Sequence, residues 1–558
     1  MLNIMSKKKN LLRSGFSLSI LTMGSRILGL IREMTKATFL GTSDLADAFT
    51  FAFQLPNLFR RLFAENAISV AFIPTFRNKL EEETAKNPDL DYSQLIETRQ
   101  FLNSTLTVVT FLTTLVSALG MILIPFIAPF FTKSSDPIFL GEMSTLTRIM
   151  FPYLIFISVA AFFQGILNGV NIFSPSGFTP ILFNLIVITC TYAFAGKTAN
   201  PARAMAYGVI FGGVVQAAFQ LPFVLKQGFR FSLTGLKKAF TNPNTKTVMR
   251  LIVPTLFGMA AYQLNDLVSM AVAGNAGSGI QSSLQYSLRL QELILGIFAV
   301  TIGTIILPDL TSYAKNKDFT QFNGLLKNAI RIIAFITIPI TFFAFVTGEN
   351  IIRLVFQNKS FSEESVALVK QAFQYHIVGL FFIALNRILS PAFYAQSNTK
   401  SPTIAGIIGF GANIILAIAL APAFKGGGIA FALSFSSAIN TVFLFIFMKK
   451  GENTQTGDVV KTTILYSLKM IVLSIIAIIP VILLKEWIFG LFANYNRLIS
   501  QGLPLIILIL IFGIIGVLLM IITKDSLVKT IVSIVKNRGR KTKVSPEKHQ
   551  ETNHEEKQ

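Results

Sequence analysis

The chain has 558 residues, of which 52% are apolar and only 14% carry a charge, and its formal net charge is +22. A soluble domain carries about 25% charged residues, whereas the apolar residues here form runs of about 20, which is the length of a membrane-spanning helix. The composition therefore excludes a soluble enzyme or nucleic-acid-binding domain and indicates an all-α polytopic membrane protein. We interpret the positive charge as a topology signal, because most lysines and arginines fall in short loops.

Fourteen apolar segments are long enough to span a bilayer. The first resembles a signal peptide, but its apolar residues continue through Arg26 and Arg32 without a clean cleavage site, so we expect an uncleaved span. Basic residues collect in segments that all fall on one side if the spans number fourteen: 226–250, 313–331, 449–461 and 536–543. Both termini are therefore predicted to be cytoplasmic.

A weak internal repeat has an offset of about 230 residues. Asn171–Pro175 recurs as Asn398–Pro402, and Leu55–Pro74 resembles Leu290–Pro308, although chance similarity between apolar helices is the alternative. Six spans separate the halves, which predicts two six-helix lobes in a parallel pseudo-two-fold repeat. We expect an N-terminal lobe (1–225), a cytoplasmic linker (226–247), a C-terminal lobe (248–448), two further spans (449–523) and a basic, partly disordered cytoplasmic tail (524–558).

The first two spans contain charged residues that a bilayer does not tolerate facing lipid. A charge near the bilayer centre costs about 2.5–3.5 kcal/mol on insertion scales, so these side chains must face one another or a wet cavity. They are Arg26, Arg32 and Glu33 in the first span and Arg60, Arg61 and Glu65 in the second. Arg26 and Arg32 are six positions apart, about 240° around the helix, and are expected to see different neighbours.

Local pairing divides the remaining charges. Arg61 and Glu65 stand at i,i+4 and can pair, which leaves Arg60, like Arg32, without an obvious local partner. In the eighth span Arg289 and Glu292 stand at i,i+3 and share one face. We therefore expect one arginine of the adjacent pair in the second span to be structural.

After this pairing an excess of guanidinium groups is left for the cavity. The planar fork of arginine suits phosphate and carboxylate, so we predict an anionic cargo such as a phosphate ester. Asp266 in the seventh span either pairs with Arg289 or forms a coupling-ion or proton site, and the sequence leaves both open. Nucleotide-binding and hydrolytic motifs are absent, and the single Cys190 and three histidines argue against a metal site.

Four stretches carry a resemblance to a known family: SRILGLIRE (25–33), DLADAF (44–49), QLPNLFRRLFAENAISVAFIP (54–74) and YSLRLQELILGIFAVTIGTIILP (286–308). They resemble the MurJ (MviN) family of lipid II flippases, within the multidrug/oligosaccharidyl-lipid/polysaccharide exporter superfamily. The resemblance implies fourteen spans, two six-helix lobes in a V shape and a C-terminal helix pair that forms a groove for a polyprenyl tail. It implies a transporter rather than an enzyme, which moves lipid II across the bacterial cytoplasmic membrane by alternating access.

The resemblance also implies roles for individual residues. It assigns Arg32, Arg60 and Arg289 to a central cavity that holds the diphosphate, and it places Asp47 near the outer gate. Together with the pairings above, three groups are expected: substrate binding (Arg26, Arg32, Arg60 and Arg289), gating or charge pairing (Glu33, Asp47, Arg61, Glu65 and Glu292) and an ion site (Asp266 and Asn386). No cofactor or metal is expected, and coupling to the membrane potential, Na⁺ or H⁺ is left open.

Two other functions are weighed against this one. A cation-coupled multidrug or organic-ion antiporter of the same superfamily would have twelve spans and an acid-rich cavity. A polyprenyl-phosphate-dependent membrane transferase would need acidic motifs in its loops, and the exposed loops here are short. The expected partners are lipid II, membrane lipids and cell-wall synthesis proteins, with no nucleic acid and with the chain as a monomer.

Overall fold

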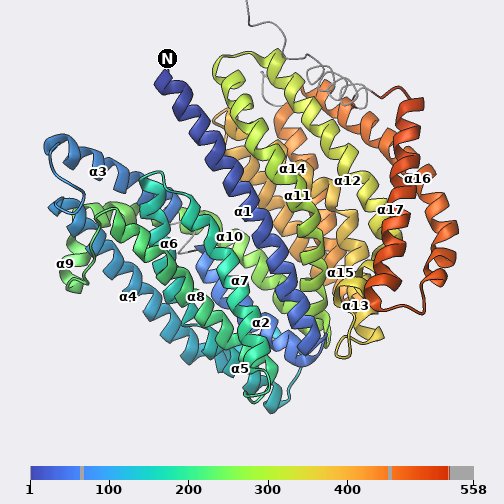
Figure 1. Ribbon diagram of the computed structural model, residues 1–558, viewed down its shortest axis with the longest axis horizontal. Helices are drawn as coiled ribbons and strands as arrows, with labels where there is room; N and C mark the ends of the chain where they lie inside the picture. The colour runs from blue at the N-terminus through green and yellow to red at the C-terminus, as the bar shows by residue number, and fades with distance from the viewer. Residues whose placement is uncertain (1, 63–67, 450–454, 526, 528–558) are drawn as a thin grey trace, which may run out of the picture.

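The computed structural model describes residues 2–62, 68–449, 455–525 and 527, and these contain helices and turns but no β-strand (Figure 1). The all-α prediction is confirmed for this part of the chain. The α-helices are α1 (Leu2–Leu40), α2 (Asp44–Arg60), α3 (Ile73–Lys86), α4 (Ile96–Ile127), α5 (Pro137–Met150), α6 (Tyr153–Gly169), α7 (Ser174–Phe194), α8 (Pro201–Lys226), α9 (Leu236–Thr241), α10 (Pro243–Ala276), α11 (Ile280–Lys315), α12 (Phe319–Phe356), α13 (Glu363–Val378), α14 (Leu380–Ala395), α15 (Lys400–Lys449), α16 (Thr456–Leu491) and α17 (Leu503–Ile522). Three short helical segments complete the set: η2 (Ile68–Phe72), η3 (Ala128–Phe131) and η4 (Leu498–Gly502).

Several helices begin at a pair of residues that the sequence marks clearly, a capping side chain followed by proline. Asp136, Asn200 and Asn242 accept hydrogen bonds from backbone N–H groups in the first turns of α5, α8 and α10. Each cap satisfies an N–H that has no partner within the helix, and the proline that follows has no N–H to leave unpaired. These three pairs therefore determine where three of the long helices start.

Three large clusters of buried apolar side chains hold the helices together. Two come from the first part of the chain, one around Phe51 and Phe151 and one around Phe76 and Phe162. The third, around Phe356, is built mainly from α11–α15. The helices of the first two clusters form one group, and those of the third cluster form a second group. Between the two groups runs α1, which packs on α7 on one side and on α11 on the other (Figure 1). The contact of α1 and α2 with α10 and α11 is called the seam below.

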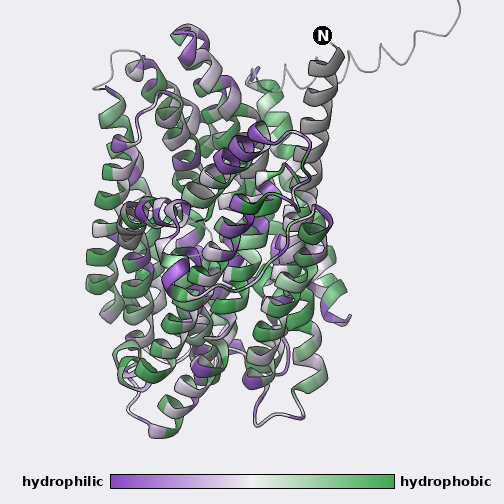
Figure 2. Cartoon of the chain, turned by 90° about the vertical axis from the view of Figure 1, so that its left-hand side faces the viewer, coloured by the Kyte–Doolittle hydropathy of each residue, from purple (hydrophilic) through white to green (hydrophobic). Residues whose placement is uncertain are grey.

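The hairpin of α16 and α17 lies at the right-hand edge of Figure 1 and contacts the other helices mainly through α12. Tyr466 shares a buried apolar cluster with Ala334 of α12, and Leu508 shares another with Phe343 of α12. Other apolar side chains of the hairpin, such as Leu483, are largely exposed. Figure 2 shows the same pattern elsewhere, since hydrophobic residues dominate the long upright helices and hydrophilic ones concentrate in the segments that connect or cross them. Exposed apolar faces of this kind are suited to contact lipid tails.

Length and composition do not reproduce the predicted count of fourteen spans. Eight helices of the described residues are long and apolar enough to cross a membrane, or nine if α13 and α14, which bend by 43°, count as one span. One of the eight, α15, contains two of the predicted spans on either side of a break at Lys425 (φ 46°, ψ −128°). The other predicted spans fall on α1, α2, α10 and α11, which carry the charged residues of the seam.

Candidate functional site

The two groups of helices meet where α1 ends and α2 and α11 begin, a region that we call the Gly41 end. Asp47 of α2 is 6% exposed, and its two carboxylate oxygens accept hydrogen bonds from the backbone N–H groups of Gly279 and Ser282, each at 2.7 Å. A carboxylate at a helix N-terminus is stabilised by the unpaired N–H groups and the helix dipole. The buried Tyr286 hydroxyl donates to the Gly41 carbonyl at 2.8 Å. Asp47 therefore caps α11 from across the seam and ties the two groups together.

A pocket lies on the seam between α1, α2, α7, α8 and α11. Its cavity volume is about 10 Å³, which is room for about one water molecule, so a larger ligand would require the helices around it to move apart. Its charged lining residues are Arg32, Glu33 and Lys36, all from α1. Gln54 of α2 and Gln285 of α11 also line it, and the Nε2 of Gln54 donates to the Oε1 of Gln285 at 2.8 Å. The pocket therefore joins the two groups of helices and has more positive than negative charge.

The prediction that Arg32 has no local partner is wrong. Its Nη2 donates to Oε1 of the adjacent Glu33 at 2.8 Å, and its guanidinium lies 5.0 Å and 5.7 Å from the ring centres of Phe53 and Phe183. Adjacent residues on a helix point about 100° apart, but these two long side chains bend toward each other inside the pocket. The Nζ of Lys36 lies 3.2 Å from the other oxygen of Glu33. One carboxylate therefore faces two cations.

Arg26 and Arg289 lie on the seam itself, each over a glycine of the opposite helix. A β-carbon at Gly29 would collide with the Arg289 guanidinium, and one at Gly296 would collide with Arg26, so the glycines make room for both side chains. Arg26 donates to the backbone carbonyl of Glu292 at 3.0 Å, and Arg289 contacts its carboxylate at 3.1 Å. The predicted pair of Arg289 and Glu292 is confirmed. The buried Nε of Arg289 has no hydrogen-bond partner among the described residues, which leaves it unused donor capacity.

The adjacent arginines at the end of α2 take different partners. Arg60 donates to Oδ1 of Asn57 in its own helix at 2.9 Å, so the prediction that it has no local partner is wrong as well. Arg61 contacts the Asp266 carboxylate of α10 at 2.8 Å. The predicted partner of Arg61, Glu65, lies outside the described residues. The alternative pairing of Asp266 with Arg289 is contradicted, because α10 presents Asp266 to α2 while α11 presents Arg289 to α1.

The three arginines predicted to hold an anion are brought together only in part. Arg32 lines the pocket, and Arg289 reaches α1 at Gly29, close enough for its charge to act on Glu33. Arg60 is not among the described residues that line the pocket. The role of all three in binding one substrate stays a prediction.

The two candidates for an ion site lie in different surroundings. Asn386 of α14 donates to the Ser437 carbonyl at 2.9 Å and accepts from the Thr441 hydroxyl at 2.7 Å, both in α15. Asp266 is engaged by Arg61 instead. Among the residues that the structure describes, no group of three or more histidine, cysteine, aspartate or glutamate side chains is arranged to hold a metal ion.

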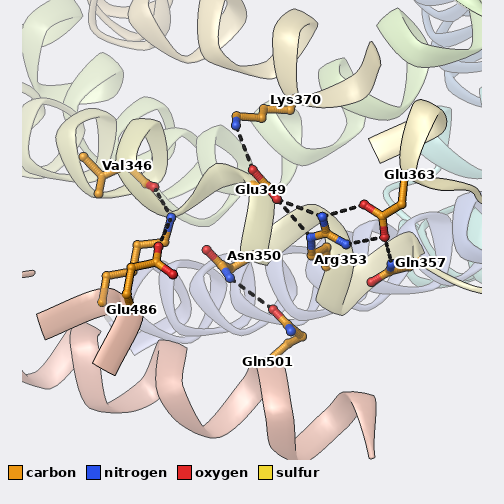
Figure 3. Close-up of polar contacts among 10 residues, drawn as sticks. Val346, Glu349, Asn350, Arg353, Gln357, Glu363, Lys370, Glu486 and Gln501 are labelled. Carbon is orange, nitrogen blue, oxygen red and sulfur yellow. Dashed lines mark hydrogen bonds and ion pairs between the residues drawn. The ribbon is translucent and has the colours of Figure 1, made fainter. Parts of the chain in front are cut away.

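A second charged cluster joins α12 and α13 at the Gly41 end (Figure 3). Arg353 donates to both oxygens of Glu363, each at 2.6 Å, and to Glu349 at 2.9–3.1 Å. Lys370 contacts the other oxygen of Glu349 at 2.7 Å. In the same view, a hydrogen bond between the side-chain amides of Asn350 and Gln501 joins α12 to η4. We call Glu349, Arg353, Glu363 and Lys370 the α12–α13 network.

Comparison with known proteins identifies the family. The sequence model of the family described as lipid II flippase MurJ matches residues 36–498. The chain belongs to this MurJ family. A relative described as a probable lipid II flippase MurJ, from Treponema pallidum (strain Nichols), is 44% identical over 526 residues, which are 93% of this chain and 97% of that protein. One of the same description from Vibrio cholerae serotype O1 is 33% identical over 444 residues, 78% of this chain and 82% of that protein.

A solved MurJ structure supports the fold. It is described as lipid II flippase MurJ in an inward closed conformation, and it superimposes with a TM-score of 0.72 at 24% identity over 90% of this chain and 98% of that one. The match to the MurJ family model includes Asp47, Arg60 and Arg289 and begins four residues after Arg32. MurJ proteins are described as flippases, which are transporters, so the prediction of a transporter rather than an enzyme is confirmed.

Some residues of the site were missed by the sequence interpretation. Lys36 stands one turn after Arg32 in the same span, and counting every charge in that span would have found it. Gln54 and Gln285 are 231 positions apart, whereas the stretches Leu55–Pro74 and Leu290–Pro308 are offset by 234–235, so the internal repeat does not mark them as a pair. The α12–α13 network carries no sequence signal either, because its members become neighbours only when α12 and α13 pack.

Proposed function

We propose that this chain flips the peptidoglycan precursor lipid II from the inner to the outer leaflet of the bacterial cytoplasmic membrane. The observation that carries the proposal is the pocket on the seam, where a member of the MurJ family presents Arg32 and Lys36 against a single carboxylate. Arginine suits the diphosphate of the lipid II headgroup because its planar fork matches phosphate oxygens. The family relationship supports the same substrate, since the relatives are described as probable lipid II flippases.

The proposed topology has fourteen spans and cytoplasmic termini. Length and composition define only part of this set. It is completed by the four seam helices α1, α2, α10 and α11, by counting the two halves of α15 separately, and by the bent pair α13–α14. Spans 1–6 and 7–12 form two lobes related by a pseudo-two-fold axis along the membrane normal. The bond between Gln54 and Gln285 joins the two lobes across the seam. The positive-inside rule assigns the Gly41 end to the outside.

In the proposed cycle, the headgroup enters from the cytoplasmic side, and its diphosphate binds Arg32 and Arg289, with Arg26 and Arg60 along the path. Rocking of the lobes then opens the Gly41 end, which requires Asp47 to leave the N–H groups of α11. The polyprenyl tail stays in the membrane, in a groove at α16 and α17. The membrane potential or a Na⁺ or H⁺ gradient supplies the energy, the chain acts as a monomer, and cell-wall synthesis proteins are its expected partners.

A replacement experiment tests this function. Bacteria depleted of their own lipid II flippase receive the chain as wild type, Arg32→Ala, Arg60→Ala, Arg289→Ala or Arg203→Ala. Arg203 is the matched control, because it is paired with Glu142 at 2.6 Å and is not among the residues that line the pocket. The readout is lipid II at the outer face, measured with an impermeant probe, alongside the amount of each variant in the membrane.

We expect wild type and Arg203→Ala to restore lipid II at the outer face and the three pocket and seam variants to fail at equal expression. Failure of the wild type despite normal membrane expression would overturn the proposed function. Normal function of all three arginine variants would leave the family assignment in place but remove the arginine-based mechanism.

A further inference from the structure

The Lys36 side chain is buried and is held from three helices. Its Nζ lies 3.2 Å from Oε2 of Glu33 in α1 and donates to the Thr50 hydroxyl of α2 at 3.2 Å. The same ammonium stands 4.3 Å from the ring centre of Tyr286 in α11, which is a cation–π contact. Lys36 itself is 3% exposed, and Tyr286 is fully buried. A lysine is rarely buried to this extent unless its charge has a purpose or a partner.

The two oxygens of Glu33 are divided between two cations. Oε1 accepts the hydrogen bond from Arg32 at 2.8 Å, while Oε2 faces Lys36 and has no hydrogen bond of its own among the described residues. In this arrangement Glu33 neutralises Arg32, the arginine that the diphosphate would bind. A bound diphosphate would compete with Glu33 for Arg32, and two anions next to each other in a buried site repel strongly.

Removal of Glu33 from Arg32 is possible only if the carboxylate keeps another partner. A buried carboxylate without a cation costs several kcal/mol. Lys36 provides that partner, because it is already 3.2 Å from Glu33 and is fixed by Thr50 and Tyr286. The carboxylate can therefore turn from Arg32 toward Lys36 without leaving the pocket.

We propose that Lys36 is a positioning residue that receives Glu33 when the diphosphate takes Arg32. Substrate binding then exchanges one ion pair for another: Glu33 moves from the guanidinium to the ammonium, and the diphosphate replaces it on the guanidinium. No bond is made or broken. The inference rests on the proposed function, and it specifies which residue makes Arg32 available to the substrate.

The test uses the purified full-length chain in nanodiscs, titrated with lipid II, with and without substitutions at both partners. Lys36→Met removes the second cation, so Glu33 stays on Arg32 and lipid II should bind about tenfold more weakly. Lys36→Arg keeps the charge and should bind within about twofold of wild type. The double variant Glu33→Gln with Lys36→Met has no carboxylate to displace and should regain the lost affinity, although it lacks the lysine.

The matched control is Lys370→Met, which breaks a lysine–glutamate pair of 2.7 Å in the α12–α13 network. It should bind lipid II like wild type. If Lys36→Met binds as Lys370→Met does, or if the double variant binds no better than Lys36→Met, the positioning role is overturned while the flippase function stands. If the wild type itself binds no lipid II and fails the replacement experiment, the proposed function falls, and this inference falls with it. The double variant also guards against misfolding, because it removes both members of the buried pair.

Discussion

The α12–α13 network, which is partly exposed, and the seam pocket, which is buried, both gather charges, but they balance them differently. In the network, Arg353 and Lys370 face Glu349 and Glu363, and each side chain meets at least one opposite charge at 2.6–2.9 Å (Figure 3). In the pocket, Glu33 alone faces both Arg32 and Lys36, and Arg289 is close by. Charges that are matched in number stabilise a structure, whereas an excess of buried cations is costly unless an anion arrives. The imbalance is therefore the reason for which we propose the pocket, and not the network, as the place of the substrate anion.

The largest expected effect comes from making the same substitution, arginine to alanine, once in the pocket and once in the network. Arg32→Ala should weaken lipid II binding about 100-fold, since losing a desolvated charge contact costs about 2–5 kcal/mol. Its melting temperature should hardly change, because Glu33 keeps Lys36. Arg353→Ala should leave lipid II affinity unchanged and lower stability by about 1–3 kcal/mol, discounted for partial exposure, because two carboxylates then share Lys370.

Lipid II titration and thermal unfolding of the two variants in the same detergent measure both effects. A large loss of stability with normal affinity in Arg32→Ala would break the comparison, since the pocket charges would then be structural like those of the network.

The Asp47 carboxylate, which accepts hydrogen bonds from backbone N–H groups at the start of α11, provides the next test. Asp47→Asn removes the charge that faces the start of α11, and an amide has one acceptor oxygen where the carboxylate has two. We expect the Gly41 end to open more often, by about 1–1.5 kcal/mol or roughly tenfold. The measurement is maleimide labelling of Ser282→Cys in a Cys190→Ser background, because Ser282 is fully buried beside Asp47.

Asp136→Asn is the control for this labelling, because Asp136 caps α5 within one group of helices. It should leave the labelling rate at Ser282→Cys unchanged. Equal rates in Asp47→Asn and its parent would show that the contact does not hold the Gly41 end closed.

Much of the fold could be predicted from the sequence, and there are physical reasons why some contacts of the site could not. Composition and motifs predicted the helical membrane fold, the family and the helices that hold the charges, since these depend on residue type and local spacing. The partner of Arg32 was missed because i,i+1 side chains were expected to diverge, whereas both are long enough to reach each other at 2.8 Å. The contact of Asp47 could not be predicted at all, because its donors are backbone groups 232 and 235 positions away.

The smallest expected effect concerns the ion pair of Asp266 and Arg61, which shares features with both the network and the pocket. Asp266 and Arg61 are matched like the network but are 40% and 43% exposed, so solvent screens their attraction. Asp266→Asn should change stability by at most about 1 kcal/mol. Because Arg61 already neutralises this carboxylate, we expect Asp266→Asn to leave any dependence of lipid II flipping on Na⁺ or pH as it is in wild-type proteoliposomes, and Arg61→Gln to do the same. If Asp266→Asn abolishes the dependence on Na⁺ or on pH while Arg61→Gln does not, Asp266 is the coupling-ion site that the sequence left open. In that case a pair of equal and opposite charges would be functional too, and charge imbalance would not distinguish functional from structural charges.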